Sequence, residues 1–342
     1  MVGGRRIPGK NNFCGRNWCV YDACGIVCGL FTWLLLSYGQ FCILAIMMTS
    51  FEDNKIHQSI NFLIFEILFV LSGAAHLKTM FTDPGAVPKG TLTEEYIAQL
   101  EKEQQFNGTV LYKCTKCSSI KPERAHHCSV CKRCIRRMDH HCPWVNNCVG
   151  ENNQKCFVLF TFYISLLSCH TLYWAIRQFV WCVGSDWKPC SVFSPPATTI
   201  LLIFLLFESQ FVWCVGSDWK PCSVFSPPAT TILLIFLLFE SVLFSIFTAV
   251  MFGTQISAIC SDQTGIENIK QERNWNNNGR RSVKPNTNED IENCDNNNNK
   301  SSPAWKNLQV VFGGGGGQKF SFKWLNPFDV PYHSEKAFEF SV

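Results

Sequence analysis

Charged residues are scarce in this chain of 342 residues: Asp, Glu, Lys and Arg together make up 16% of it, against about 25% in an average soluble domain. They are rarest in four apolar runs, each of about the 20 residues that a helix needs to cross a hydrocarbon core of about 30 Å. Buried helices of a soluble domain are the weaker explanation for four such runs. We therefore predict membrane-spanning helices at 26–48, 60–80, 156–179 and 229–252.

We do not expect a cleavable signal peptide, because no apolar core follows the basic residues of 1–17. Lys and Arg are sparse between the first two runs, where only Lys55 occurs, but twelve lie from Lys78 to Lys155 and ten lie after 252. Such residues accumulate on the cytosolic side of a membrane. The tail 1–25, the segment between the second and third runs, and the tail 253–342 are therefore expected in the cytosol.

Residues 178–209 and 210–241 are identical. This tandem duplication creates a spare apolar segment at 197–216, which contains Glu208. A central acid costs about 2.5–3.5 kcal/mol on insertion scales, so this segment is marginal as a membrane helix. A further crossing would also move the C-terminal tail to the other side of the membrane. We therefore predict four functional crossings.

Two other features of the chain carry weaker expectations. The Asn-rich stretch 274–300 has the composition of a disordered linker. Each copy of the duplication contains two cysteines, for which we prefer a packing role to a disulfide: Cys182, Cys190, Cys214 and Cys222.

Aliphatic residues are few at 112–155, so this segment cannot bury enough apolar surface to fold by itself. It contains instead the pattern C-x2-C-x9-H-x6-C twice, fourteen residues apart. Each copy provides four ligands for a tetrahedral Zn²⁺, whose binding would supply folding free energy. The predicted ligands are Cys114, Cys117, His127 and Cys134 for one ion, and Cys128, Cys131, His141 and Cys148 for the other.

Cys142 is left over once both sets of ligands are complete. A third copy of the pattern would begin at Cys142, but Val145 stands where its second cysteine should be. An acid, Asp139, appears beside His140 at the same place. We predict that Cys142 is a nucleophile, that His140 is its general base and that Asp139 orients the imidazole. The alternative is that Cys142 is a further metal ligand.

The position of Cys142 indicates its substrate. It lies fourteen residues before the third apolar run begins, so its thiol must be close to the cytosolic surface of the membrane. A long-chain acyl thioester fits that position, and thiol–thioester exchange in two steps is the fitting reaction.

The sequence from Asp139 to Cys142, in this cysteine-rich setting, resembles the DHHC family of protein S-acyltransferases, the palmitoyltransferases. The resemblance covers nearly the whole chain, and it is strongest to Golgi-type members. The runs that carry it are DPGAVPKG, CSSIKPERAHHCSVCKRCIRRMDHHCPWVNNCVGENNQK and VMFGTQ. Thr264 and Glu267 match the family's TTxE motif, in which Gly265 is a departure, and Asn307 with Phe312 resembles its C-terminal PaCCT element.

The resemblance implies an all-α integral membrane protein with four transmembrane helices and a cytosolic two-zinc domain of short hairpins between helices 2 and 3. It implies that palmitoyl-CoA acylates Cys142, which passes the acyl group to juxtamembrane cysteines of cytosol-facing proteins. It also implies a multi-pass protein of the Golgi membrane with both termini in the cytosol. Its zinc ligands coincide with the eight residues named above.

Several partner assignments remain open on the sequence alone. Four basic residues between the zinc ligands would hold either the phosphates of CoA or lipid head groups: Lys132, Arg133, Arg136 and Arg137. The final residues, Phe340 to Val342, would present a carboxylate to a PDZ domain, or they resemble such a ligand only by chance. A nucleic-acid partner is not expected, because a nucleic-acid-binding zinc finger would not explain the membrane spans. A zinc-bearing membrane adaptor with an idle thiol is the competing function.

Overall fold

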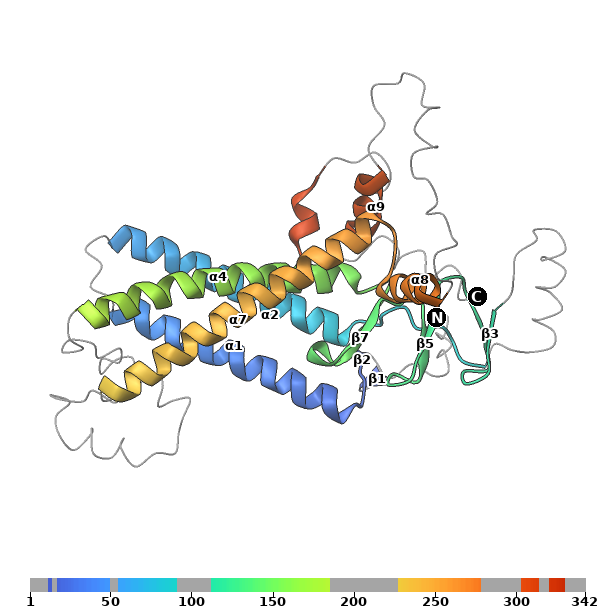
Figure 1. Ribbon diagram of the computed structural model, residues 1–342, viewed down its shortest axis with the longest axis horizontal. Helices are drawn as coiled ribbons and strands as arrows, with labels where there is room; N and C mark the ends of the chain where they lie inside the picture. The colour runs from blue at the N-terminus through green and yellow to red at the C-terminus, as the bar shows by residue number, and fades with distance from the viewer. Residues whose placement is uncertain are drawn as a thin grey trace, which may run out of the picture. The chain divides into compact units, whose positions relative to one another are not determined.

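Four long helices dominate the computed structural model (Figure 1). They are α1 (Ala23–Thr49), α2 (Lys55–Phe81), α4 (Gln154–Gly184) and α7 (Pro227–Cys260). All four are long and apolar enough to cross a membrane. The predicted fold class is thereby confirmed: a mainly helical protein with four candidate spans and a cysteine-rich region between the second and third. The structure describes residues 12–13, 17–49, 55–90, 112–184, 227–277, 303–313 and 320–329.

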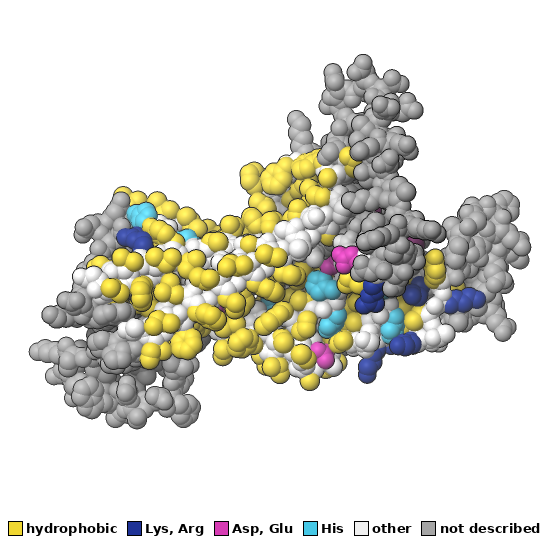
Figure 2. Space-filling view, viewed as in Figure 1, with side chains coloured by type: hydrophobic (Ala, Val, Ile, Leu, Met, Phe, Trp, Pro, Cys, Tyr) yellow, Lys and Arg dark blue, Asp and Glu magenta, His cyan; other side chains and the backbone are white. Residues whose placement is uncertain are grey.

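Hydrophobic side chains cover the outside of these helices, as the face in Figure 2 shows. Leu30 and Leu34 of α1, Leu63 of α2, and Phe236 and Phe239 of α7 are all more than half exposed. A soluble protein rarely tolerates so much apolar surface, whereas lipid covers such surface at no cost. The exposed faces are therefore those of membrane helices.

The chain forms two compact units. Where the structure describes the second unit, residues 30–73 and 160–252, it forms segments of the four long helices. Polar side chains link its helices: Gln40 Nε2 donates to Glu66 Oε1 at 2.8 Å, and the Tyr38 hydroxyl donates to the Leu233 carbonyl at 2.8 Å. Hydrogen bonds of this kind hold membrane helices together where the hydrophobic effect cannot.

The first unit, residues 1–29, 74–159 and 253–342, holds the cysteine-rich region. That region is three short antiparallel hairpins in sequence: β3 (Tyr112–Cys114) with β4 (Ser119–Lys121), β5 (His126–Cys128) with β6 (Arg133–Ile135), and β7 (His140–Cys142) with β8 (Asn147–Val149). A fourth small pair, β1 (Asn12–Phe13) with β2 (Asn17–Trp18), precedes α1. The fourteen-residue period of the sequence is thus one hairpin per repeat.

The three hairpins also turn in the same way. Ser118, Lys132 and Asn146, which are spaced by fourteen residues, have left-handed backbone angles of φ 46°, 53° and 45°. In the third hairpin this turn is the short helix η1 (Pro143–Val145). The turn geometry therefore persists where the second cysteine of the pattern has become Val145.

The C-terminal part of the first unit adds α8 (Gly265–Asn277), α9 (Pro303–Phe312) and the 3-10 turn η2 (Phe322–Leu325). Thr264 and Glu267 begin α8 with a capping box: the Thr264 amide donates to Glu267 Oε2 at 2.8 Å, and the Glu267 amide donates to the Thr264 hydroxyl at 3.4 Å. Figure 1 shows α8 beside strands β5 and β7.

Most of the duplicated sequence, including the spare segment 197–216, lies outside the described residues. So do 278–300 of the Asn-rich stretch, although its first residues, 274–277, belong to α8. Cys182, at the end of α4, is disulfide-bonded. The preference for a packing role was wrong for this cysteine.

Candidate active site and metal centres

Each metal centre joins two neighbouring hairpins. The first takes Cys114 and Cys117 from the end and turn of the β3–β4 hairpin, and His127 and Cys134, which face each other across β5 and β6. The second repeats this arrangement one hairpin later, with Cys128 and Cys131 followed by the facing pair His141 and Cys148. The four donor atoms of each group lie within 4.8 Å of one another.

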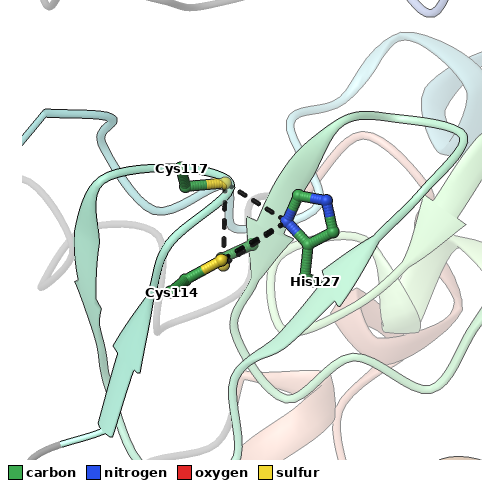
Figure 3. Close-up of side chains that lie close together, drawn as sticks. Cys114, Cys117 and His127 are labelled. Carbon is green, nitrogen blue, oxygen red and sulfur yellow. Dashed lines mark hydrogen bonds between the residues drawn. The ribbon is translucent and has the colours of Figure 1, made fainter.

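The spacing of the donors suits a tetrahedral ion. In the first group the His127 Nδ1 atom lies 3.7 Å from Cys114 Sγ, 3.2 Å from Cys117 Sγ and 3.9 Å from Cys134 Sγ (Figure 3). In the second group the His141 Nδ1 atom is 3.4 to 3.8 Å from the three sulfurs. Metal–ligand bonds of about 2.0–2.3 Å in a tetrahedron separate neighbouring donors by about 3.5–3.8 Å. Each cluster can therefore hold a metal ion.

Strand alternation decides which histidine of each pair faces the metal cluster. Successive side chains of a strand point to opposite faces. His127 and His141 point into the clusters, whereas His140 forms a hydrogen bond with Asp139 instead. The structure thus separates His140 from the ligands although it is adjacent to one of them.

Asp139 and His140 form a close pair. The His140 Nδ1 atom lies 2.6 Å from Asp139 Oδ2, and the Asp139 side chain is only 4% exposed. Burial alone would raise the pKa of Asp139, but hydrogen bonds from His140, the Gly265 amide and Gln255 outweigh it and lower that pKa. The carboxylate is therefore ionised and fixed in place.

Cys142 lies at the end of β7, beside this pair. Burial lowers the pKa of His140, but the hydrogen bond with Asp139 and the interaction with the Cys142 sulfur outweigh burial and raise it to about 9. The other ring nitrogen, Nε2, is buried and makes no hydrogen bond of ordinary geometry within the part of the chain that the structure describes. Phe157 of α4 packs edge-on against the ring, with centroids 5.3 Å apart. The imidazole is thus held between an acid, a thiol and an aromatic wall.

Two groups to which the sequence analysis gave no role in the site also hold Asp139. Gln255, near the end of α7, donates from Nε2 to Asp139 Oδ2 at 2.9 Å, and the backbone amide of Gly265 donates to Asp139 Oδ1 at 2.5 Å. A Cβ at position 265 would lie 3.2 Å from that same oxygen. Glycine lets the first turn of α8 approach the carboxylate with its backbone.

A network of ion pairs fastens α8 to the hairpins. Arg124 donates to both Glu267 oxygens at 2.8 Å, in a bidentate arrangement, and also pairs with Asp262. Arg137 pairs with the same Asp262. This network holds the C-terminal segment, and therefore the Gly265 amide, against Asp139.

The four basic residues proposed to hold phosphates are not equivalent. Arg133 is only 1% exposed, donates to the Val87 carbonyl at 2.9 Å and lies over the Trp18 ring, so a phosphate cannot reach it. Arg136 pairs with Glu151 at 2.7 Å, and Arg137 with Asp262. Lys132 is exposed at the turn of the second hairpin.

The other family motifs support the hairpins and the C-terminal segment. Asp83 Oδ1 accepts hydrogen bonds from the Gly85 and Ala86 amides, and the Gly85 carbonyl accepts from the Arg136 amide at 2.9 Å. Asn307 Nδ2 donates to the Cys260 carbonyl at 3.0 Å, which joins α9 to the end of α7.

Comparison with known proteins gives consistent matches. Residues 109–272 match the family model described as DHHC palmitoyltransferase. The chain is 44% identical over 318 residues to human palmitoyltransferase ZDHHC3, covering 93% of this chain and 85% of that protein. It is 43% identical over 320 residues to mouse palmitoyltransferase ZDHHC7, covering 93% and 83%. A shorter match, 44% over 108 residues and 30% of the chain, is to the probable protein S-acyltransferase 12 of Arabidopsis thaliana.

Proposed function

This chain belongs to the DHHC palmitoyltransferase family and is a protein S-palmitoyltransferase, and we propose that Cys142 is the residue that carries the acyl group. The observation that supports this choice is its place in the repeat. Cys142 occupies the position that holds a metal-facing thiol in the two preceding hairpins, but the third hairpin has Val145 in place of the partner cysteine. Its thiol interacts instead with His140.

The proposed reaction has two thioester exchanges. His140 takes the proton of the Cys142 thiol, and the resulting thiolate attacks the carbonyl of palmitoyl-CoA. A new C–S bond forms as the C–S bond to CoA breaks, and the CoA thiolate leaves. A cysteine thiolate of the substrate protein then attacks the Cys142 thioester, and Cys142 leaves as a thiolate. Asp139 holds the imidazole with Nε2 directed away from the carboxylate and favours the imidazolium that forms.

We propose that the metal clusters hold two structural Zn²⁺ ions. Three thiolates and one imidazole are the donor set of many structural zinc sites. The ions would supply folding free energy to hairpins that have little apolar core of their own. The residues that would hold them are the eight named above.

For the donor, we propose that Lys132, Arg136 and Arg137 face the phosphates of CoA, and we leave Arg133 out because it is buried. The last two arginines already pair with Glu151 and Asp262, so a phosphate would exchange with or join these carboxylates. Lipid head groups remain the competing ligand for the same charges.

We propose that both termini and the cysteine-rich region face the cytosol. Trp18 Nε1 donates to Asn147 Oδ1 at 2.9 Å, and Gly265 contacts Asp139, so the three extramembrane segments belong to one compact unit. This supports one side for all three, and the excess of Lys and Arg supports the cytosolic side. A lumenal C-terminal tail in a protease-protection assay would overturn this orientation.

Golgi residence and substrate proteins with juxtamembrane cysteines are proposed from the family resemblance. A PDZ partner is proposed from the final three residues, which lie outside the described part of the chain. Localisation of the protein in cells tests Golgi residence, and binding of the C-terminal peptide to PDZ domains tests that partner.

The test of the catalytic assignment is site mapping of the acyl-enzyme. The purified chain, mixed with palmitoyl-CoA and quenched in acid, is expected to carry hydroxylamine-sensitive palmitate on Cys142. Cys142→Ser is expected to abolish turnover. Full acylation of substrate by the folded Cys142→Ser variant would overturn the proposal.

A further inference from the structure

The start of α1 lies directly on the turn that follows Cys142. Asn146 Nδ2, in that turn, donates to the Val20 carbonyl at 2.9 Å. Gly25 is buried, and a Cβ added to it would lie only 2.1 Å from Asn146 Oδ1. The first turn of α1 therefore approaches the active-site hairpin so closely that no side chain fits between them.

Two thiols flank Gly25 on α1. Cys24 and Cys28 are four residues apart, so they lie on one face of the helix, and their thiols interact with each other. Cys28 lies one helical turn from Gly25, on the part of α1 that packs against the active-site hairpin, and its thiol interacts electrostatically with the Cys142 thiol. Cys24 is exposed, and Cys28 is partly exposed. The hairpin that carries the proposed acyl carrier thus packs against a helix start that carries a second nucleophile.

Resting on the proposed role of Cys142, we propose that Cys28 is an intramolecular acyl acceptor that takes the palmitoyl group from Cys142. The Cys28 thiol loses its proton and attacks the thioester carbonyl. A C–S bond to Cys28 forms as the C–S bond to Cys142 breaks, and the Cys142 thiolate leaves and takes up the proton. The exchange needs no oxidant, reductant or cofactor.

Thermodynamics and position both permit this step. Both sulfurs are alkyl thiols of cysteine, so their thioesters are close in energy and the exchange is reversible. Cys28 lies one turn inside the candidate membrane span that starts at Ala23, which leaves the acyl chain at the bilayer edge. Transfer frees Cys142 for a second molecule of donor, so one chain can store two acyl groups.

The experiment loads the full-length protein in lipid nanodiscs with palmitoyl-CoA, quenches it in acid at successive times, and maps hydroxylamine-sensitive palmitate by tandem mass spectrometry. Palmitate is expected first on Cys142 and then on Cys28, with a total that approaches two per chain. Cys28→Ser and Cys28→Ala are expected to stop at one. Cys142→Ser is expected to lose the label at both positions.

Cys24→Ser is the matched control, because it removes the neighbouring thiol and leaves the acceptor; its total is expected to stay near two. Acyl on Cys142 with none on Cys28 of the wild-type chain would overturn this inference and leave the proposed function intact. Equal labelling of Cys28 in Cys142→Ser would also overturn it, because the donor would then react directly. Absence of label on Cys142 while the folded chain still transfers palmitate would instead contradict the catalytic assignment on which this inference rests.

Discussion

The Gln255 side chain donates a hydrogen bond from Nε2 to Oδ2 of Asp139, 2.9 Å away, in a buried setting. That oxygen is the one that also faces His140 Nδ1. Gln255 stands 116 residues from Asp139 in the sequence, near the end of a membrane helix. The membrane helix thereby contributes directly to the orientation of the imidazole.

Gln255→Leu is expected to slow autoacylation of Cys142 by about 10–100-fold, because a hydrogen bond to a charged group is worth about 1.5–3 kcal/mol. The measurement is the burst rate of acyl-enzyme formation at saturating palmitoyl-CoA. Gln255 does not touch the reacting thiol, so the apparent KM is expected to change less than the rate. Gln263→Leu, at an exposed position near the start of α8, is the control. Equal burst rates for wild type and Gln255→Leu would contradict the positioning role.

The division of the cysteines between metal and acyl group can be tested by metal content. Cys131→Ser is expected to lose about one zinc per chain, because it removes a sulfur that lies 3.4 Å from both His141 Nδ1 and Cys148 Sγ. Cys142→Ser is expected to keep two. Mass spectrometry of metals in the purified chains makes the comparison. Equal zinc loss in both variants would place Cys142 among the ligands.

The ion pair between Arg124 and Glu267 makes stability depend on pH. The hydrogen bond from Arg124, supported by the Thr264 amide and opposed by burial, lowers the pKa of Glu267 from 4.5 to about 2. A carboxyl whose folded pKa is depressed stabilises the fold above its unfolded pKa and loses that effect as pH falls. The contribution is therefore complete above about pH 4.5 and declines towards pH 2.

Glu267→Gln is accordingly expected to lower the free energy of unfolding by about 1 kcal/mol at neutral pH, since both side chains keep about a quarter of their exposure. The difference from wild type is expected to stay constant from about pH 7 to pH 5 and to shrink below pH 4.5. Thermal or denaturant unfolding across this range measures it. Glu272→Gln, an exposed position on the same helix, controls for general charge effects. A difference that grows as pH falls would show the opposite linkage.

The sequence predicts the metal clusters well because short spacings along the chain determine where their ligands lie. The fourteen-residue period places each Cys-x2-Cys in a turn and each His–Cys pair across a hairpin, as the register shows. Gln255 and Gly265 follow no such rule, because they reach Asp139 through tertiary contacts from a distant segment. The run VMFGTQ, which ends at Gln255, and the motif departure at Gly265 were the signals in the sequence, but neither indicates a contact with Asp139.

Arg133 and the end of α7 show two other limits. Arg133 lies among three basic neighbours in sequence, yet its place in β6 turns it inwards towards the Val87 carbonyl. Composition alone cannot detect that direction, because the strand is only three residues long. The apolar run ends at 252, whereas α7 continues to Cys260. A helix need not end where the hydrocarbon does, and this extra length is what brings Gln255 to the active site.

Loss of the Asn147 side chain is expected to damage the packing around the end of α2. Asn147 is fully buried, and its Nδ2 donates to the carbonyls of Thr79 and Thr82 at 2.9 Å each, at the end of α2. Its Oδ1 accepts from Trp18 Nε1 and from the Cys148 amide. One amide therefore satisfies the last carbonyls of a membrane helix, which have no partner within the helix, and the start of the chain.

Asn147→Ala is expected to cost about 2–4 kcal/mol of stability, because it leaves several buried polar groups without partners. It is also expected to slow acylation, since Asn147 faces Cys142 across the third hairpin. Thermal unfolding in detergent, followed by the acylation burst, measures both effects. Asn152→Ala is the matched control, because the Asn152 Oδ1 atom is buried but makes no hydrogen bond within the part of the chain that the structure describes. Similar losses in the two variants would mean that the Asn147 amide does not join these segments.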